Sequence, residues 1–528
     1  MWVHLRRCFS HKAWATVSPK DMSSAHPGLV KNLVGGHWVD SSVTVKLPDP
    51  LTGELCMVVP ETQIPETAPY IANFRTVSKS GLHNPLKNVE RYLLYGDVCQ
   101  KVAAALHQKD NFDFFVKMIQ RNLGKSTGQA AGEMRVVRTF FENFAGDNVR
   151  FLAKGFSAPG DHLGQQSQGY RWPYGPVAII APFNFPLEIP MLQTMGALFM
   201  GNQVLLKPDH RTAICTEQFI RLLHYCGMPT GDVSLLNGQH LAVDHLIKKN
   251  LFRLTQFTGS SKVAEYLSEA TRGKVRLEDA GFDWKLLGPD VSDIDYVAYQ
   301  SDQDAYAFSG QKCSAQSILL AHTNWVQAGL FQKLKTLAAR RKLDDLTIGP
   351  VITWTTPKIQ DHVDKVAALP GARVLFGGKP LTGHQIPSVY GAFEPTAVFV
   401  PMEQLLANFK LCTTELFGPF QVVTEWTDVK NVLEVLERMD HHLTAAVVSK
   451  DAVFLNHILA HSVNGTTYAG IRARTTGAPQ NHWFGPAGDP RGAGIGSPEA
   501  IQMVWSCHRE IILDQGPISA GWKTPPAS

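Results

Sequence analysis

The sequence predicts an α/β fold with two domains, and two series of segments support this prediction. Short apolar runs alternate with amphipathic stretches from about residue 175 to 277, and a second such series follows residue 280. This alternation is typical of parallel sheets whose faces are covered by helices. Residues 85–153 have helical periodicity throughout, so we expect helices before the first sheet. A chain of 528 residues can hold domains of this size.

The individual elements follow from these patterns. In the first series, strands are expected in the apolar runs 175–183, 202–208, 231–238 and 253–259. A helix should lie between the second and third strands, because Ile214, Phe219 and Leu222 recur at helical spacing before Gly227. In the second series, strands are expected at 285–289, 317–322, 371–378, 421–426 and 442–450, with helices at 331–343 and 429–439.

The charge of the chain is concentrated at its N-terminus. The net charge is +4, and residues 1–20 hold Arg6, Arg7, Lys12 and Lys20 but no acid, so the remainder is neutral. A nucleic-acid-binding protein usually carries its basic excess on the folded body, so nucleic acid is not an expected partner. An acid-poor, amphipathic and Arg-containing start is typical of a mitochondrial presequence, which predicts a matrix protein. No apolar run reaches about 18 residues, so no membrane span is expected.

The eight cysteines are scattered and form no CxxC pair. This distribution argues against a disulfide framework and against a metal site. Cys313 differs from the others, because Gly310 and Lys312 give it small or cationic neighbours. A nearby cation favours the thiolate, so Cys313 is a candidate nucleophile. Taken alone, this motif also fits an ordinary cysteine near a helix.

Three further motifs place polar groups where expected strands end. Asn184 lies on a turn before a helix, where its amide can hold a developing oxyanion or simply cap the turn. Glu278 and Asp279 both end an apolar strand, and either can be a functional or an ion-paired acid. Ser260 or Ser261 can cap the next helix, whose start is a possible anion site.

Two glycine-containing motifs are rejected. Gly124-Lys125-Ser126-Thr127 resembles a phosphate loop, but Ile119 occupies the position that requires a glycine. The segment 492–496 resembles a dinucleotide fingerprint but lacks the third glycine and a following βαβ unit.

The order of the remaining motifs is more specific than any one of them. PFNFP, LLKP, FTGSS, LEDAG, GQKC and ELFGP follow one another along the chain. In this order they resemble the aldehyde dehydrogenase superfamily from about residue 35 to 515. The segments GQKCSA, GYRWPYGP and LEDAGFDWKLLGPD are similar to the plant-type mitochondrial pyrroline-5-carboxylate dehydrogenase branch. The resemblance implies NAD-dependent oxidation of L-glutamate γ-semialdehyde to L-glutamate in proline catabolism.

The resemblance also implies roles for individual residues. The implied nucleophile, general base and oxyanion donor are Cys313, Glu278 and Asn184. The residues implied to bind NAD are Phe183, Lys207, Asp209, Gly259, Ser260, Glu415 and Phe417. The residues implied to hold the substrate carboxylate are Ser314, Gly492 and Ala493, although the register of the last two can slip by one or two positions. His210 replaces the acid that is usual near the adenosine ribose, so NADP stays an alternative cofactor.

The same resemblance divides the chain and implies a homo-oligomer. It implies a presequence at 1–20, a Rossmann-type NAD-binding domain at 30–150 and 174–277, a catalytic domain at 278–498, and a small β oligomerisation element at 151–173 and 499–515. Three other functions remain open: oxidation of another semialdehyde such as succinate semialdehyde, a CoA-acylating dehydrogenase, and a non-catalytic NAD-binding scaffold.

Overall fold

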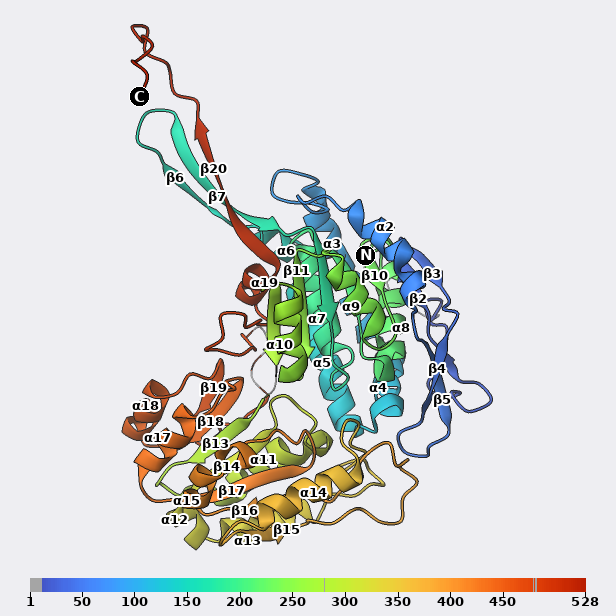
Figure 1. Ribbon diagram of the computed structural model, residues 1–528, viewed down its shortest axis with the longest axis vertical. Coiled ribbons are helices and arrows are strands. Elements are labelled where there is room, and N and C mark those ends of the chain that lie inside the picture. The colour runs from blue at the N-terminus through green and yellow to red at the C-terminus, as the bar shows by residue number, and fades with distance from the viewer. Residues whose placement is uncertain (1–11, 280, 478, 480–481) are drawn as a thin grey trace.

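The chain forms two lobes, each built around a seven-stranded sheet (Figure 1). This architecture is seen in a computed structural model that describes residues 12–279, 281–477, 479 and 482–528. Most of the predicted presequence, residues 1–11, therefore lies outside the described residues. The first sheet has the order β12-β11-β8-β9-β10-β2-β3. Its strands are β2 (Asn32–Val34), β3 (His37–Val39), β8 (Pro176–Ile180), β9 (Gln203–Lys207), β10 (Val233–Leu235), β11 (Leu254–Gly259) and β12 (Val275–Asp279).

Strands β8 to β12 are parallel, and the four strands predicted in the first series are confirmed. Their side chains are almost all buried, as expected for a parallel sheet covered on both faces. The lobe contains helices α2 (Ala68–Arg75), α3 (Glu90–His107), α4 (Lys109–Leu123), α5 (Thr127–Asn143), α6 (Asn148–Phe151), α7 (Glu188–Phe199), α8 (Ala213–Tyr225), α9 (Leu241–Lys248) and α10 (Ser261–Ala270), and the short helices η1 (Ile64–Thr67) and η2 (His210–Thr212).

The helical segment before the first sheet is interrupted at a position where the periodicity predicted that the helix continues. Helix α5 ends at Asn143, and α6 begins only at Asn148. Gly146 lies between them with φ +65°, and its N–H donates to the Gly96 carbonyl over 3.0 Å. A Cβ on Gly96 would lie 1.7 Å from the Gly146 oxygen, so the loop packs directly on α3. This close backbone approach ends the helix although the apolar pattern continues.

The second sheet has the order β15-β16-β17-β14-β13-β18-β19, and the five strands predicted in the second series are confirmed. The strands are β13 (Asp283–Leu287), β14 (Gln316–His322), β15 (Arg373–Phe376), β16 (Thr396–Phe399), β17 (Phe420–Trp426), β18 (Thr444–Val448) and β19 (Thr466–Ala469). The helices of this lobe are α11 (Ile294–Tyr306), η3 (Ala307–Gly310), α12 (Thr323–Gln327), α13 (Leu330–Ala338), α14 (Thr356–Ala367), α15 (Met402–Ala407), α16 (Phe409–Cys412), α17 (Val429–Glu437) and α18 (Ala452–Ala460).

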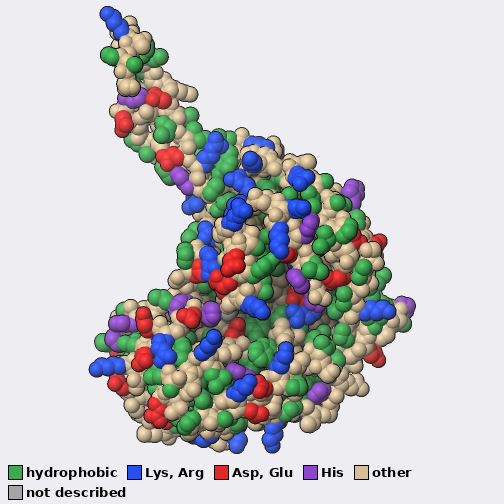
Figure 2. Space-filling view, viewed as in Figure 1, with side chains coloured by type: hydrophobic (Ala, Val, Ile, Leu, Met, Phe, Trp, Pro, Cys, Tyr) green, Lys and Arg blue, Asp and Glu red, His purple; other side chains and the backbone are tan. Residues whose placement is uncertain are grey.

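Two smaller sheets complete the fold. One joins β1 (Gly28–Leu29), β4 (Thr44–Pro48) and β5 (Leu55–Pro60). The other joins β6 (Phe156–Pro159), β7 (Gln165–Pro173) and β20 (Ser506–Asp514) into an arm that projects from the body and bears exposed hydrophobic side chains (Figures 1 and 2). That this arm serves oligomerisation stays a prediction.

The segment 499–515 belongs only partly to the arm. Its first residues lie in α19 (Pro498–Trp505), which packs on α7 of the first lobe. Trp505 is buried there, and its indole N–H donates to Gln193 Oε1 over 3.1 Å. Asn202 donates to the Trp505 carbonyl over 2.9 Å. The helix therefore fixes the base of the arm to the body.

The chain passes from the first sheet to the second sheet within a few residues. Strand β12 ends at Asp279 in the first sheet, and β13 begins at Asp283 in the second. Loops at the ends of strands from both sheets therefore meet at this junction, as is usual for sites in α/β proteins. In the described part of the chain, no helix has the length and apolar character to cross a membrane. The same residues contain no His, Cys, Asp and Glu cluster suited to a metal ion.

Candidate active site

The loop that carries Cys313 is held rigidly between η3 and β14. Phe308 and Ser309 have φ values of +56° and +52°, which non-glycine residues rarely adopt. The Ser309 hydroxyl donates to the Gly349 carbonyl over 3.0 Å. A Cβ on Gly310 would lie 2.1 Å from the Gly418 oxygen, so only glycine fits there. Such strained and tightly packed backbone is common at functional sites, and here it presents Cys313 at the junction.

Glu278 lies beside the Cys313 thiol. It is on β12 and only 5% exposed, and its carboxyl contacts the thiol. Burial raises the pKa of Glu278 to about 7, while the contact with Cys313 opposes the increase. Its Oε1 atom is buried without a hydrogen-bond partner among the described residues. A carboxylate with a pKa near neutrality can act as a general base at physiological pH. Asp279, the alternative acid, interacts instead with Ser261 and His441.

Lys312 does not have the effect on Cys313 that its position in the sequence predicted. Burial, and then the charge of Glu278, raise the pKa of Cys313 well above the usual thiol value. The Lys312 ammonium does not pair with the sulfur but donates to the Gln303 carbonyl over 3.3 Å. Burial lowers the pKa of Lys312 to about 8. Cys313 is therefore a thiol in this state, and Glu278 is the group placed to take its proton.

Asn184 reaches the nucleophile loop from the other lobe. It follows β8 on the turn before α7 and is 2% exposed. Its side-chain amide donates to the Gln311 carbonyl, two residues before Cys313, over 3.3 Å. The second N–H of this amide is available to a ligand, so Asn184 can hold an oxyanion next to the sulfur. The neighbouring Phe183 packs edge-on against Phe417, with ring centres 5.9 Å apart.

Lys125, from the rejected phosphate-loop motif, has a structural role behind this site. Its ammonium forms a buried ion pair with Glu133 at 2.8 Å. The same nitrogen lies 4.2 Å from the ring centre of Phe185 and 4.5 Å from that of Phe308. Phe185 follows Asn184, and Phe308 begins the nucleophile loop. The cation therefore joins the two loops that carry the nucleophile and the amide, which is consistent with rejecting a phosphate site.

A second group of predicted residues lies at the carboxyl ends of β9 and β11. Strand β11 ends at Gly259, and Ser260 occupies the N-cap of α10 without making a side-chain capping bond. The first N–H groups of this helix are therefore open to an anion such as a pyrophosphate. Lys207 ends β9, and its ammonium uses one N–H on the Pro208 carbonyl. These positions suit a dinucleotide, because its phosphates and ribose need such donors.

Asp209 is already engaged in the protein. Its carboxylate accepts two hydrogen bonds from the Arg211 guanidinium, at 2.8 and 2.6 Å, and also caps η2. Arg211 in turn lies 4.9 Å from the ring centre of Phe183. Asp209 therefore positions this turn, and Lys207 is the side chain beside it that retains free donors.

Glu415 and Phe417 enter the junction from the loop before β17. Glu415 accepts a hydrogen bond from the Gly281 N–H over 3.1 Å, and burial raises its pKa to about 8. Its charge acts on Cys313, which places it near the sulfur. A Cβ on Gly281 would lie 1.9 Å from the Cys313 carbonyl oxygen, which explains the glycine after the LEDA segment. The structure thus brings together Cys313, Glu278, Asn184 and Glu415.

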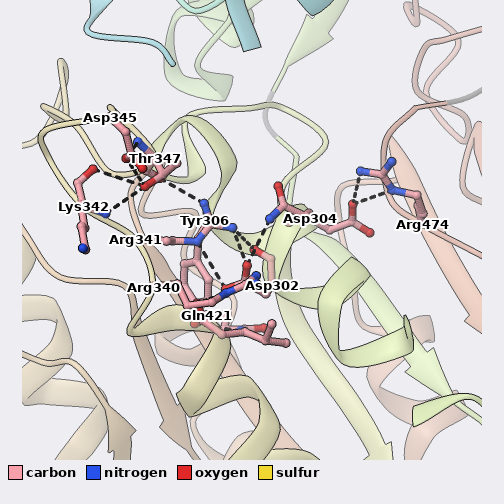
Figure 3. A network of polar contacts seen from close by, with 12 residues as sticks. Asp302, Asp304, Tyr306, Arg340, Arg341, Lys342, Asp345, Thr347, Gln421 and Arg474 are labelled. Atoms are coloured by element: carbon pink, nitrogen blue, oxygen red, sulfur yellow. Dashed lines mark hydrogen bonds and ion pairs between the residues drawn. The ribbon is translucent and has the colours of Figure 1, made fainter. Parts of the chain in front are cut away.

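A cavity of about 370 Å³ opens onto Cys313 and is lined by apolar and polar residues, some of which are charged. Ser314, Lys312 and Arg474 are among them. Asp304 holds Arg474 by accepting from its Nε and Nη2 atoms at 3.2 Å (Figure 3). Asp304 also accepts from the buried ammonium of Lys285 over 2.8 Å, so its position is well determined. A cationic end next to the nucleophile is suited to an acidic aldehyde.

Gly492 and Ala493 are not part of this cavity, in contrast to the predicted register. Gly492 forms a parallel bridge with Leu277 of β12, and its N–H donates to the Asp489 carbonyl over 2.9 Å. The Ala493 N–H donates to the Leu277 carbonyl over 2.8 Å, and Ala493 is 1% exposed. Neither N–H is free to bind a carboxylate. Arg474 was not predicted, because it lies in a loop without periodicity and its pairing with Asp304 depends on the fold.

Two α/β lobes with a thiol, a buried carboxyl group and an amide donor at their junction form the arrangement expected of an aldehyde dehydrogenase. The sequence agrees: residues 38–491 match the Aldehyde dehydrogenase family, and the chain belongs to this family. It is 58% identical to the mitochondrial Delta-1-pyrroline-5-carboxylate dehydrogenase 12A1 of Arabidopsis thaliana, over 98% of this chain and 94% of that protein. It is also 58% identical to a probable aldehyde dehydrogenase of Linum usitatissimum, over 99% and 96% of the two chains.

Solved structures share the fold at low sequence identity. An NAD-dependent aldehyde dehydrogenase of Sinorhizobium meliloti matches with a TM-score of 0.81 and 20% identity, over 95% of this chain and 97% of that chain. A variant of the betaine aldehyde dehydrogenase of Staphylococcus aureus, solved in complex with NAD+, matches with a TM-score of 0.79 and 20% identity. That match covers 96% of this chain and 99% of the other.

Proposed function

We propose that the protein oxidises L-glutamate γ-semialdehyde, which forms from pyrroline-5-carboxylate, to L-glutamate with NAD as the hydride acceptor. The observation that carries the proposal is the contact between Cys313 and Glu278 at the end of a cavity lined by Lys312 and Arg474. The first pair suits oxidation of an aldehyde, and the second suits a substrate with a carboxylate. The identity to a pyrroline-5-carboxylate dehydrogenase supports this choice and places the reaction in proline catabolism.

The protein groups divide the chemistry between them. Glu278 takes the proton of the Cys313 thiol, and the sulfur attacks the aldehyde carbon to form a thiohemiacetal. The Asn184 amide donates to the oxyanion that develops on the former carbonyl oxygen. NAD, when bound, accepts the hydride from this carbon, which leaves a thioester on Cys313. Once its proton has passed to solvent, Glu278 removes a proton from water, and the resulting attack releases the acid and the thiol.

The cofactor fits the residues that would hold it. The uncapped first turn of α10 after Gly259 offers N–H groups to the pyrophosphate, and Lys207 offers donors to the adenosine ribose. Glu415 is buried at the junction with a raised pKa, so a hydroxyl-rich ribose would supply hydrogen bonds that its carboxyl lacks. Phe183 and Phe417 form an aromatic contact beside it. We therefore assign NAD binding to this face of the junction.

The substrate carboxylate is assigned to Ser314, Lys312 and Arg474. Arg474 can form two parallel hydrogen bonds with a carboxylate, and Lys312 adds a point charge. Asp304 holds the guanidinium by its Nε and one Nη2 hydrogen, which leaves further N–H groups free for a ligand. This assignment replaces Gly492 and Ala493, whose N–H groups are used within the protein.

The substrate is tested by comparing kcat/KM for pyrroline-5-carboxylate and succinate semialdehyde, with NADH formation as the readout. We expect the value for pyrroline-5-carboxylate to be at least about 10-fold higher, because one well-placed polar contact is worth about that factor. A preference for succinate semialdehyde would transfer the assignment to that substrate. Formation of an acyl-CoA when CoA is supplied would instead indicate the acylating reaction.

We also propose that the protein is imported into the mitochondrial matrix and cleaved before Trp14. Trp14 is 5% exposed and stacks on Phe115, with ring centres 5.2 Å apart, while Phe114 packs on its edge. The Thr16 N–H donates to the Gln218 side chain over 3.0 Å. This segment is therefore part of the folded body, so a presequence of 20 residues would remove core contacts.

The N-terminal residue of the protein purified from the matrix tests both points. We expect cleavage among residues 1–13, so that Trp14 is retained. A mature chain that begins after residue 20 would contradict the structural role of Trp14, and recovery of the protein outside the matrix would contradict the location. A chain lacking residues 1–11 is the control, because its melting temperature should match that of the imported protein.

A further inference from the structure

The wall of the substrate cavity carries a carboxylate that the reaction above does not use. Glu188 is the first residue of α7, and it lines the same cavity as Cys313 and Ser314. Its backbone N–H donates to the Glu133 carboxylate, but among the described residues no group donates a hydrogen bond to the Glu188 carboxyl oxygens. A half-buried carboxylate without a partner is unusual, because such groups are normally paired or hydrogen-bonded.

The nearby acid Glu133 differs in this respect. Its Oε2 atom accepts from the Lys125 ammonium at 2.8 Å, and its Oε1 atom accepts from the N–H groups of Leu187 and Glu188 at 2.9 and 3.3 Å. Lys125 is therefore committed to Glu133. Burial, and then the charge of Glu133, raise the pKa of Glu188 to about 8. A cation brought by a ligand would stabilise the ionised form of Glu188. Both carboxyl oxygens of Glu133 already accept hydrogen bonds, whereas those of Glu188 accept none from the described residues.

The cavity thus has separate groups for both charges of an amino acid. Lys312, Arg474 and Arg135 line it with positive charge, and Glu188 lines it with negative charge beside Glu133, which is already paired with Lys125. We infer that Glu188 binds the α-ammonium group of the substrate, while Arg474 and Lys312 bind its carboxylate. This inference rests on the proposed function and narrows it. The enzyme would select an α-amino acid semialdehyde over the semialdehyde of a plain dicarboxylic acid with the same chain length.

The test compares two substrates that differ only in the ammonium group. Glutamate γ-semialdehyde, supplied as pyrroline-5-carboxylate, is compared with glutarate semialdehyde, which has the same carbon chain without nitrogen. In Glu188→Gln, we expect kcat/KM for the amino substrate to fall about 10- to 100-fold, the usual effect of losing a charge-assisted hydrogen bond. The value for glutarate semialdehyde should change by less than about 3-fold, because that substrate makes no contact with a cation site. Arg474→Met serves as the comparison, since it should lower both values.

The outcomes separate this inference from the proposed function. An equal loss for both substrates in Glu188→Gln would mean that Glu188 acts in catalysis or in folding, and no loss for either would mean that it does not touch the substrate. Both results overturn the inference while wild-type turnover of pyrroline-5-carboxylate upholds the function. A wild-type enzyme that prefers glutarate semialdehyde would overturn both.

A binding measurement keeps the inference testable if the variant turns over slowly. The products L-glutamate and glutarate differ in the same ammonium group, and each can be titrated against the enzyme by calorimetry. We expect wild-type enzyme to bind L-glutamate more tightly than glutarate, and Glu188→Gln to lose this difference. An unchanged difference in a variant with wild-type melting temperature would refute the ammonium site.

Discussion

Replacement of Cys313 by alanine is expected to abolish NADH formation from any aldehyde while NAD binding persists. Among the described residues at the junction, Cys313 is the one whose thiol can form the covalent intermediate, because the hydroxyl of Ser314 beside it is far less nucleophilic. Removal of a covalent nucleophile commonly lowers kcat by at least about 10⁴-fold, and we expect a loss of that size. The measurement is steady-state NADH formation from pyrroline-5-carboxylate, with NAD affinity determined by calorimetry.

A matched control is available on the arm. Cys507 is also a free and half-buried cysteine, but it lies on β20 and pairs with Trp172 of β7, away from the junction. Cys507→Ala should retain full activity, whereas substantial turnover in Cys313→Ala would contradict the mechanism. Loss of NAD binding in Cys313→Ala would instead show that the variant is misfolded, so the melting temperatures of both variants are compared with that of the wild type.

Replacement of Glu278 by glutamine is expected to lower kcat by about 10²- to 10⁴-fold, the usual contribution of a general base. The variant cannot activate the water that releases the acid, so the thioester should accumulate. Because the hydride leaves before this step, a burst of NADH close to one per active site should precede the slow phase. The burst itself should accelerate as pH rises, because the Cys313 proton must then leave to solvent.

The pH profile provides a second readout. The pKa of Glu278 is raised to about 7, and the ionised form is the active base. Wild-type kcat/KM should therefore increase as pH rises through about 7, and Glu278→Gln should lack this inflection. Because the pKa of Glu278 is higher in the folded than in the unfolded state, ionisation of Glu278 destabilises the folded state. The contribution of Glu278 to the free energy of unfolding therefore decreases as the pH rises from 4.5 through 7. At pH values above 7, the glutamine variant should thus be at least as stable as the wild type.

Asp279→Asn is the matched control for the base. This acid is adjacent in sequence and was the alternative candidate, but its carboxyl interacts with Ser261 and His441. We expect its kcat to stay within about 3-fold of wild type, since it contacts no reacting group. A larger loss in Asp279→Asn than in Glu278→Gln would reverse the assignment of the two acids.

Some parts of the site could be predicted because they depend on local sequence. Strand ends and helix starts follow from periodicity, so Gly259 and Ser260 were predictable as a strand end and an N-cap. The ordered motifs around Asn184, Glu278 and Cys313 identified the family before any contact was known. The spatial meeting of these three residues follows from the sheet, because strand ends of the two lobes face one junction.

Other parts depend on contacts between distant segments and were missed or misplaced. Gly492 and Ala493 were expected at the substrate, but their N–H groups donate to the carbonyls of Asp489 and Leu277, respectively. Lys312 was expected to activate the thiol, but its side chain turns to the Gln303 carbonyl. Neither these backbone hydrogen bonds nor the direction of the Lys312 side chain can be predicted from the local sequence pattern, because both result from packing against other parts of the chain.

By itself the sequence determined the class of fold, most strands of the two large sheets, and the candidate residues for the chemistry. These properties follow from local periodicity and from motifs whose order is specific to the family. Only the tertiary structure decided the charge state and the partners of those residues. Burial raises the pKa of Glu278, and Asp304 holds Arg474 at the cavity. Because Lys125 pairs with Glu133, Glu188 has no ion-pair partner among the residues that the structure describes. Desolvation and pairing are properties of a three-dimensional environment, so they appear only when segments hundreds of residues apart are packed together.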